Sequence, residues 1–232
     1  MSTAPSTGSA ARSWQAASVL AYLVMIATNT LANMLPLFGR TTGEVSDRFP
    51  TLFTPAAYTF AVWGLIYLLL AAFVIYQALP RARHDERLSA ARPLFVLSSA
   101  LNALWLISWH ALALPLSELL MLALLVTLIV LYVRAGAWRA SASAWQRWLV
   151  DVPIAIYLGW ISVATIANTA ILLVSRGVDG GGAAPLLTTV MLAAATVLGL
   201  LALVTRRDWA YALAVGWGIA GIAVARTGEA GG

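Results

Sequence analysis

The chain has 232 residues, of which 61% are hydrophobic and 10% charged, and its formal net charge is +5 at pH 7. These proportions exclude an ordinary soluble domain, and several charge-free runs of about 20 residues are each long enough to cross a bilayer. The absence of cysteine excludes disulfides, thiol nucleophiles and cysteine metal sites, and the absence of lysine excludes a retinal Schiff base. We therefore predict an all-α integral membrane protein. Its arginines lie mostly in short loops between apolar runs, so we expect contact with the lipid bilayer and no nucleic-acid partner.

The N-terminal residues 1–13 are small and polar, and we expect a disordered tail over residues 1–17. An apolar run from about Ser18 to Phe38 follows, without the small-residue cleavage site of a signal peptide, and predicts a retained membrane helix. Asn29 and Asn33 lie four residues apart on one face of this helix. Buried amides in such a place either bond to neighbouring helices or contact a ligand, and we favour the contact between helices.

The segment 39–56 combines both charge signs with turn-forming residues and is too long for a minimal connector, so we interpret it as a lid-like loop. Ser46 or Asp47 is expected to cap a short helix inside it. A second membrane helix is predicted from about Ala57 to Leu79. On it, Phe60, Trp63 and Tyr67 are spaced by three and four residues and therefore share one face.

Two further helices are predicted after a basic loop, from about Pro93 to Leu112 and from about Ser117 to Tyr132. The first carries a second polar and aromatic stripe on one face, formed by Ser98, Asn102, Trp105 and Trp109. Glu118 is expected in the first turn of the other helix, with Ser117 as its cap. We favour this interpretation over a proton relay, the role that an acid inside the membrane also suggests.

A fifth helix, from about Leu149 to Val174, carries the third stripe, which consists of Pro153, Tyr157, Trp160, Ala164 and Asn168. Asp151 lies at its entrance, where we expect headgroups or loop arginines as partners. The sixth helix (about 185–205) is almost wholly aliphatic and should face lipid. The seventh (about 208–224) carries Gly216, Gly218 and Gly221, which permit close packing.

The arginines are distributed unequally between the two sides that seven helices define. Ten belong to the N-terminal tail and the even-numbered loops, and four to the opposite side: Arg40, Arg48, Arg176 and Arg226. The positive-inside rule then places the N-terminus in the cytoplasm and the C-terminus outside. We expect the cytoplasmic membrane of a bacterium as the location.

Three segments together resemble the tryptophan-rich sensory protein family (TspO/MBR, the translocator-protein family). They are FTPAAYTFAVWGLIY (53–67), LNALW (101–105) and PIAIYLGWISVATIAN (153–168). The resemblance covers residues 18–175, the five-helix core of that family. Residues 176–226 form two additional helices, and residues 227–232 form a C-terminal tail.

The resemblance implies a bundle whose cavity, closed by the first loop, binds porphyrins and other flat hydrophobic ligands. The residues that would line the cavity are Tyr58, Trp63, Tyr67, Asn102, Trp105, Trp109, Tyr157, Trp160 and Asn168. The residue pattern independently supports such a cavity, because three stripes that pair aromatic faces with an amide or hydroxyl are typical of a small-molecule pocket. The alternative is that the stripes only pack the core of the bundle.

These observations favour a membrane-embedded binding or sensory protein for tetrapyrrole-like ligands. The alternative is a transporter of such ligands or of other small solutes. An enzyme is the less favoured hypothesis, because no triad, metal cluster or nucleotide loop is present, although the resemblance also implies a light-dependent porphyrin breakdown that would involve Trp63 and Trp160. We expect no required cofactor, with a porphyrin or haem-like molecule as a ligand. Homodimer formation stays open, because the last two helices could cover the dimer face of the family.

Overall fold

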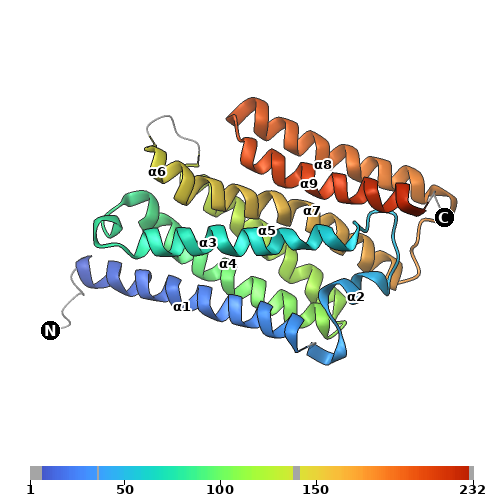
Figure 1. Ribbon diagram of the computed structural model, residues 1–232, viewed down its shortest axis with the longest axis horizontal. Helices are drawn as coiled ribbons and strands as arrows, with labels where there is room; N and C mark the ends of the chain where they lie inside the picture. The colour runs from blue at the N-terminus through green and yellow to red at the C-terminus, as the bar shows by residue number, and fades with distance from the viewer. Residues whose placement is uncertain (1–6, 36, 138–141, 230–232) are drawn as a thin grey trace.

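Seven long helices lie side by side in the computed structural model, which describes residues 7–35, 37–137 and 142–229 (Figure 1). All seven are long and apolar enough to cross a membrane, so the predicted all-α membrane architecture is confirmed. They are α1 (Thr7–Met34), α3 (Val62–Ala78), α4 (Glu86–His110), α5 (Leu114–Arg134), α7 (Val152–Ser175), α8 (Ala184–Arg206) and α9 (Trp209–Glu229).

The short elements belong to the connections between these helices. They are α2 (Thr42–Asp47), α6 (Ala144–Gln146), the π-helical turn η4 (Arg147–Asp151) and the 3-10 turns η1 (Leu37–Gly39), η2 (Ala57–Ala61), η3 (Pro80–Ala82) and η5 (Gly181–Ala183). We call the end of the bundle where α1 begins the N-side and the end where α9 finishes the C-side. The loop with α2 lies on the C-side, and α6 lies on the N-side (Figure 1).

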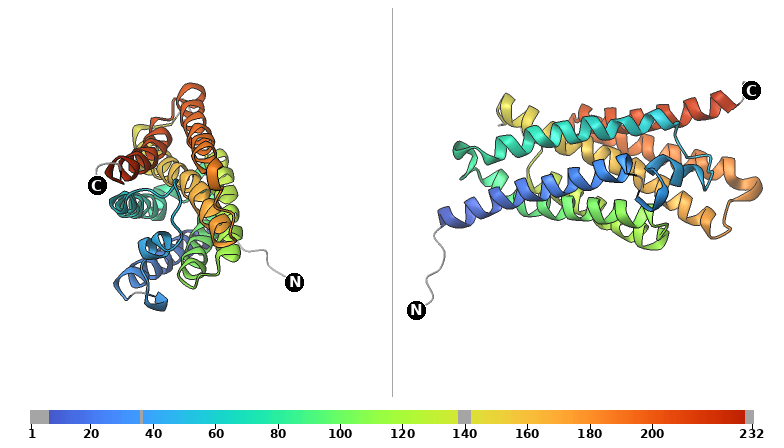
Figure 2. Two further views of the ribbon diagram at one scale, coloured as in Figure 1. Left: turned by 90° about the vertical axis from the view of Figure 1, so that its right-hand side faces the viewer. Right: turned by 60° about the horizontal axis from the view of Figure 1, so that its bottom comes forward.

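Helix α7 is the centre of the bundle. It packs between α5 and α9 and also contacts α3, while α4 packs between α1 and α5. Seen along the helices, α8 and α9 form one side of the molecule and α1 the opposite side (Figure 2). In the span Ala144–Ser175, which contains α7, 78% of the residues in the most apolar stretch are buried. In the span Gly181–Arg206, which contains α8, the share is 11%. The prediction that the aliphatic sixth span faces outward is confirmed, since only Ala195 and Gly199 of α8 are buried among its residues.

Helix α9 approaches α7 and the start of α3 through glycines. A Cβ atom on Gly218 would lie 2.8 Å from Cγ1 of Val163, and one on Gly221 would overlap the side chain of Thr59. The close packing predicted for these two residues is therefore confirmed. At Gly216 the prediction is wrong, because that residue faces open space.

Several predicted boundaries are corrected. Helix α1 begins at Thr7, so residues 7–17 are not a disordered tail; the segment AARSWQAA is rich in good helix formers that extend the first span outward. Residues 1–6 lie outside the described part of the chain. Helix α4 begins at Glu86 rather than near Pro93, since Asp85 caps it by accepting hydrogen bonds from the amides of Arg87 and Leu88. Helix α9 extends to Glu229.

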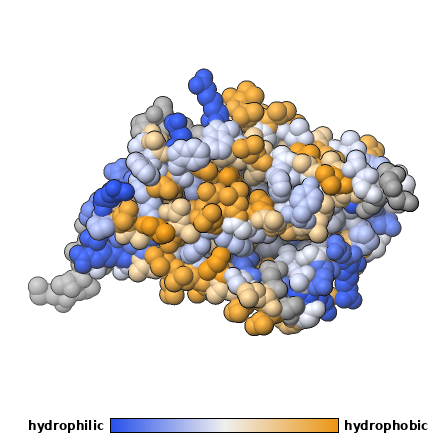
Figure 3. Space-filling view, in the orientation of Figure 1, coloured by the Kyte–Doolittle hydropathy of each residue, from blue (hydrophilic) through white to orange (hydrophobic). Residues whose placement is uncertain are grey.

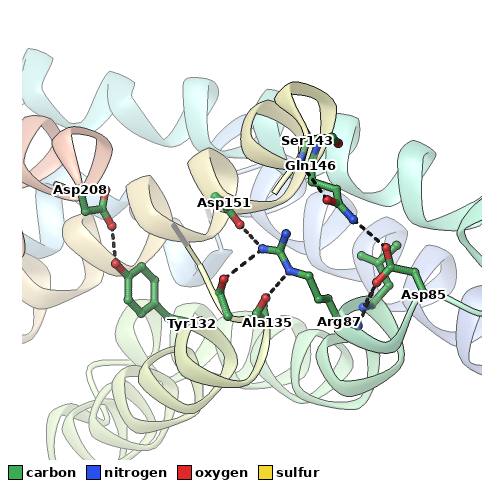
Figure 4. Close-up of polar contacts among 10 residues, drawn as sticks. Asp85, Arg87, Tyr132, Ala135, Ser143, Gln146, Asp151 and Asp208 are labelled. Carbon is green, nitrogen blue, oxygen red and sulfur yellow. Dashed lines mark hydrogen bonds and ion pairs between the residues drawn. The ribbon is translucent and has the colours of Figure 1, made fainter. Parts of the chain in front are cut away.

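The N-side is held together by buried polar contacts (Figure 4). Arg87 of α4 forms an ion pair with Asp151, whose side chain is fully buried, and donates to the carbonyl of Ala135 at 2.6 Å. An arginine is thus a partner of Asp151, as predicted, but it belongs to the first turn of α4 and not to a loop. The hydroxyl of Tyr132 donates to Asp208 at 2.7 Å, which joins the end of α5 to the start of α9.

The surface agrees with a membrane-embedded bundle. Apolar side chains spread across the middle of the face in Figure 3, and hydrophilic ones gather mostly toward its two ends. This distribution leaves the polar loops at the two ends and the spans in lipid.

Candidate ligand-binding cavity

The indole of Trp63, in the first turn of α3, is the centre of an aromatic cluster inside the bundle. It stacks on Tyr67 and Trp105 with ring centroids 5.4 and 5.9 Å apart, and meets Tyr157 and Trp160 edge-on at 6.2 Å each. Offset stacks and edge contacts are the favoured arrangements of aromatic rings. The structure therefore brings the three predicted stripes of α3, α4 and α7 to one place.

Two cavities adjoin this cluster. The inner one has a volume of about 40 Å³, enough for about one water molecule. The outer one, of about 260 Å³, lies between α1, α3, α4 and the start of α2. Thr42, Phe60 and Trp63 line both, so these three side chains separate the two spaces. The other residues of the inner cavity are Ser46, Phe53, Pro55, Trp105, Trp109, Trp160, Val163, Ala164, Ala167, Asn168 and Ile171.

The first loop covers the inner cavity from the C-side. Thr42, Ser46, Phe53 and Pro55 of this loop line the cavity. The loop is bound to the end of α4, because the indole nitrogen of Trp109 donates to the carbonyl oxygen of Thr42 at 3.2 Å. The position of the loop is the one that a lid requires.

The helix inside this loop has a different cap from the one predicted. Thr41, rather than Ser46 or Asp47, caps α2 and forms a capping box with Glu44. The sequence places Glu44 three residues after Thr41, and this is the spacing that the motif needs. Hydrogen bonds from the backbone and hydroxyl of Thr41 lower the pKa of the Glu44 carboxyl.

Asn168 connects three helices at the cavity wall. Its Oδ1 accepts from the indole nitrogen of Trp105 at 3.2 Å and from the hydroxyl of Ser117 at 3.1 Å. Its Nδ2 donates to Glu118 at 2.6 Å, and Glu118 also accepts from Thr169 at 2.7 Å. The amide therefore has one fixed orientation, with both of its polar atoms satisfied.

The roles predicted for Ser117 and Glu118 are therefore wrong. Helix α5 begins at Leu114, so Glu118 lies past its first turn and Ser117 is not its cap. Both side chains are buried and bond across to α7 instead. No contact among the described residues tests the proton relay through Glu118, which is the less favoured alternative.

Asn29 joins α1 to the aromatic cluster. Its Nδ2 donates to Oδ1 of Asn102 at 2.9 Å, and its Oδ1 accepts from the hydroxyl of Tyr67. The predicted contact between helices is confirmed for Asn29, which also lines the outer cavity. The side chain of Asn33 lies outside what the structure describes.

The indole nitrogen of Trp160 is buried and has no hydrogen-bond partner among the described residues. The buried side chains of Asn102 and Tyr157 lie within reach of one another. Buried polar atoms are nearly always satisfied in native proteins. Trp160 also lines the inner cavity, so its indole NH is a buried donor in the wall of that cavity.

The family model for TSPO-like proteins matches residues 15–230. The chain belongs to the TSPO-like protein family. The match includes α8 and α9 as well as the five helices that carry the resemblance. No curated protein and no solved structure matches the chain. Membership and the seven apolar helices together make it an integral membrane protein with a role in ligand binding or transport.

In this TSPO-like chain, most of the predicted site residues lie at the cavities. Five line the inner one, namely Trp63, Trp105, Trp109, Trp160 and Asn168. Tyr67 lines the outer cavity together with Trp63. Asn102 and Tyr157 line neither; they lie behind the walls, where Asn102 bonds to Asn29 and Tyr157 contacts Trp63.

Tyr58 is the predicted residue that the structure places elsewhere. It is 49% exposed and meets Trp217 of α9 edge-on at 5.8 Å. The 3-10 turn η2 sets its direction, and Trp217 also donates to the carbonyl of Thr59 at 2.9 Å. Sequence reasoning missed Phe53 and Phe60 as lining residues, although Phe60 shares the helical face of Trp63.

Proposed function

We propose that the chain binds planar hydrophobic ligands of the porphyrin type between α3, α4 and α7, beneath the first loop. Family membership and the aromatic cluster of five side chains centred on Trp63 support this proposal. A flat π-system matches such a wall because it stacks on aromatic faces and buries a large apolar area. The role that follows is binding or sensing within the membrane.

The observation that carries the proposal is the indole NH of Trp160. It is buried, it lines the inner cavity, and it has no acceptor among the described residues. A ring nitrogen or carboxylate of a ligand supplies the acceptor that this donor lacks. One water molecule in the inner cavity can serve this donor when no ligand is bound, and a ligand acceptor would replace it.

The cavity volumes imply that the lid moves when a tetrapyrrole binds. Ligand pockets measure about 300–1,000 Å³, whereas the inner cavity holds about 40 Å³ and the outer one about 260 Å³. Displacing Thr42 with the first loop and rotating Trp63 would join the two spaces. Loop closure over the bound ligand would then exclude water from it.

The arginine distribution supports an orientation with the N-side in the cytoplasm. The lid and the cavities then lie toward the exterior half of the bilayer. We infer that the ligand enters from that side of a bacterial cytoplasmic membrane.

Titration with protoporphyrin IX tests the proposal through quenching of tryptophan fluorescence in detergent. Saturable quenching at about micromolar ligand corresponds to about −8 kcal/mol. Trp160→Phe keeps the aromatic face and removes the NH, so we expect affinity to fall about threefold to tenfold. Trp148→Phe is the matched control, because Trp148 is 56% exposed on the N-side. Non-saturating quenching, or equal affinity in both variants, would overturn the proposal.

Transport is the second candidate function, and the buried carboxylate of Glu118 is the observation that favours it. Acidic groups inside membranes commonly mark solute or proton pathways, and Glu118 reaches the cavity through Asn168. Uptake of protoporphyrin into proteoliposomes that depends on a pH gradient and is lost in Glu118→Gln would support transport. Binding of protoporphyrin without uptake would argue against transport and leave binding as the function.

A further inference from the structure

A second, larger cleft lies on the C-side, outside the aromatic cluster. Its volume is about 530 Å³, within the range of small-molecule pockets. It lies between the first loop, the end of α7, the connection to α8, the start of α8 and the end of α9. Phe53 lines both this cleft and the inner aromatic cavity, with only 1% of its surface exposed.

One half of the cleft is apolar and lies between two spans. Leu173 and Val174 of α7 face Leu187 and Met191 of α8 across it. Helix α8 packs mainly against α9 and contacts α7 little, and 40% of Leu173 and 47% of Leu187 are exposed. This half is therefore open to the region that acyl chains occupy in a bilayer.

The other half of the cleft carries one positive and two negative side chains. Arg226 of α9 is partly buried, and its Nη2 donates to the carbonyl oxygen of Thr54 at 3.4 Å. Asp47 and Asp179 line the same cleft and are exposed. The cleft thus combines aliphatic side chains and a partly buried guanidinium with two exposed carboxylates.

We propose that this cleft binds a zwitterionic glycerophospholipid that carries a primary ammonium group. The acyl chains lie between α7 and α8, the phosphate meets Arg226, and the ammonium lies near Asp47 and Asp179. The three kinds of group match the three parts of such a lipid, and guanidinium groups are favoured partners of phosphates. An anionic lipid would instead bring a headgroup without a cation to the two carboxylates. The inference does not depend on the aromatic cavity.

Native mass spectrometry of the full chain tests this assignment. The chain is reconstituted in liposomes of equal parts phosphatidylethanolamine and phosphatidylglycerol and then released with its retained lipid. We expect the wild type to retain phosphatidylethanolamine preferentially, and Arg226→Gln to retain about tenfold less. Arg176→Gln is the matched control, because Arg176 is exposed on the same side and does not line the cleft.

Leu187→Trp fills the apolar half of the cleft without altering a charge. It provides a second test of the proposal if Arg226→Gln fails to fold. We expect it to lose retained phosphatidylethanolamine as well. Equal retention by the wild type and either cleft variant would overturn the proposal, as would preferential retention of phosphatidylglycerol by the wild type. A shift toward phosphatidylglycerol in the double variant Asp47→Asn, Asp179→Asn would support the placement of the ammonium group.

Discussion

The contact between α7 and α9 leads to a sharp prediction at Gly159. A Cβ atom added there would lie 2.7 Å from the carbonyl oxygen of Tyr211 and 2.9 Å from Cβ of Ala214. Both neighbours belong to the first two turns of α9, and the backbone of Tyr211 cannot yield without moving the helix. Gly159→Ala therefore forces the two helices apart or strains them.

The magnitude follows from comparison with Gly216→Ala. Gly216 is also helical but has open space around the position of its Cβ. Each substitution gains about 1 kcal/mol of helix propensity, and this gain cancels in the difference. Only Gly159→Ala carries the overpacking cost, which is about 1–3 kcal/mol. We expect Gly159→Ala to be less stable than Gly216→Ala by that amount.

The assay is the unfolding midpoint in mixed detergent micelles, followed by tryptophan fluorescence. Wild type, Gly159→Ala and Gly216→Ala are compared at one protein and detergent concentration. Gly216→Ala should match or exceed the wild type, and Gly159→Ala should fall below Gly216→Ala and no higher than the wild type. Equal midpoints for the two variants would refute the close packing of α9 on α7.

Three further predictions follow from polar contacts. Arg87→Gln should lower the free energy of unfolding by about 3 kcal/mol, because it removes the ion-pair partner of buried Asp151; the double variant with Asp151→Asn should recover part of the loss, and no recovery would contradict the pairing. Asn168→Leu should cost about 2 kcal/mol, since three interhelical hydrogen bonds of about 0.6 kcal/mol each are lost; a midpoint equal to that of the wild type would count against this network. Because its folded-state pKa is lowered, Glu44 stabilises the capping box above its unfolded-state pKa and loses this effect as the pH falls through the folded-state value. Proteolysis of the first loop should therefore accelerate as the pH falls below the ordinary glutamate pKa of 4.5, and Glu44→Gln, which keeps a box-forming side chain, should flatten this pH dependence.

Much of the architecture could be predicted because lipid imposes simple rules. Seven apolar runs required seven helices, and spacings of three and four residues placed Trp63, Trp105 and Trp160 on faces that had to meet inside the bundle. The aliphatic composition of α8 likewise indicated its outward position. These features depend on single helices and their period.

The features that could not be predicted from the sequence depend on how two helices pack against each other or on local turn geometry. Glu118 and Asn168 are 50 residues apart, and their hydrogen bond exists only because α5 packs on α7 in one register. Tyr58 turns toward α9 because the chain before α3 is a 3-10 turn, in which the helical period of α3 does not hold. The cap of α2 was predictable in principle, since Thr41 and Glu44 have the capping-box spacing.

The most direct test of the central claim is to fill the inner cavity and measure binding of protoporphyrin IX. Ala164→Leu places a larger side chain in that cavity, and Ala193→Leu places the same one on the exposed face of α8. We predict that Ala193→Leu binds like the wild type and that Ala164→Leu binds at least about tenfold more weakly, which is about 1.4 kcal/mol. Equal affinity of the two variants, each with the thermal stability of the wild type, would contradict a ligand site in the aromatic cavity.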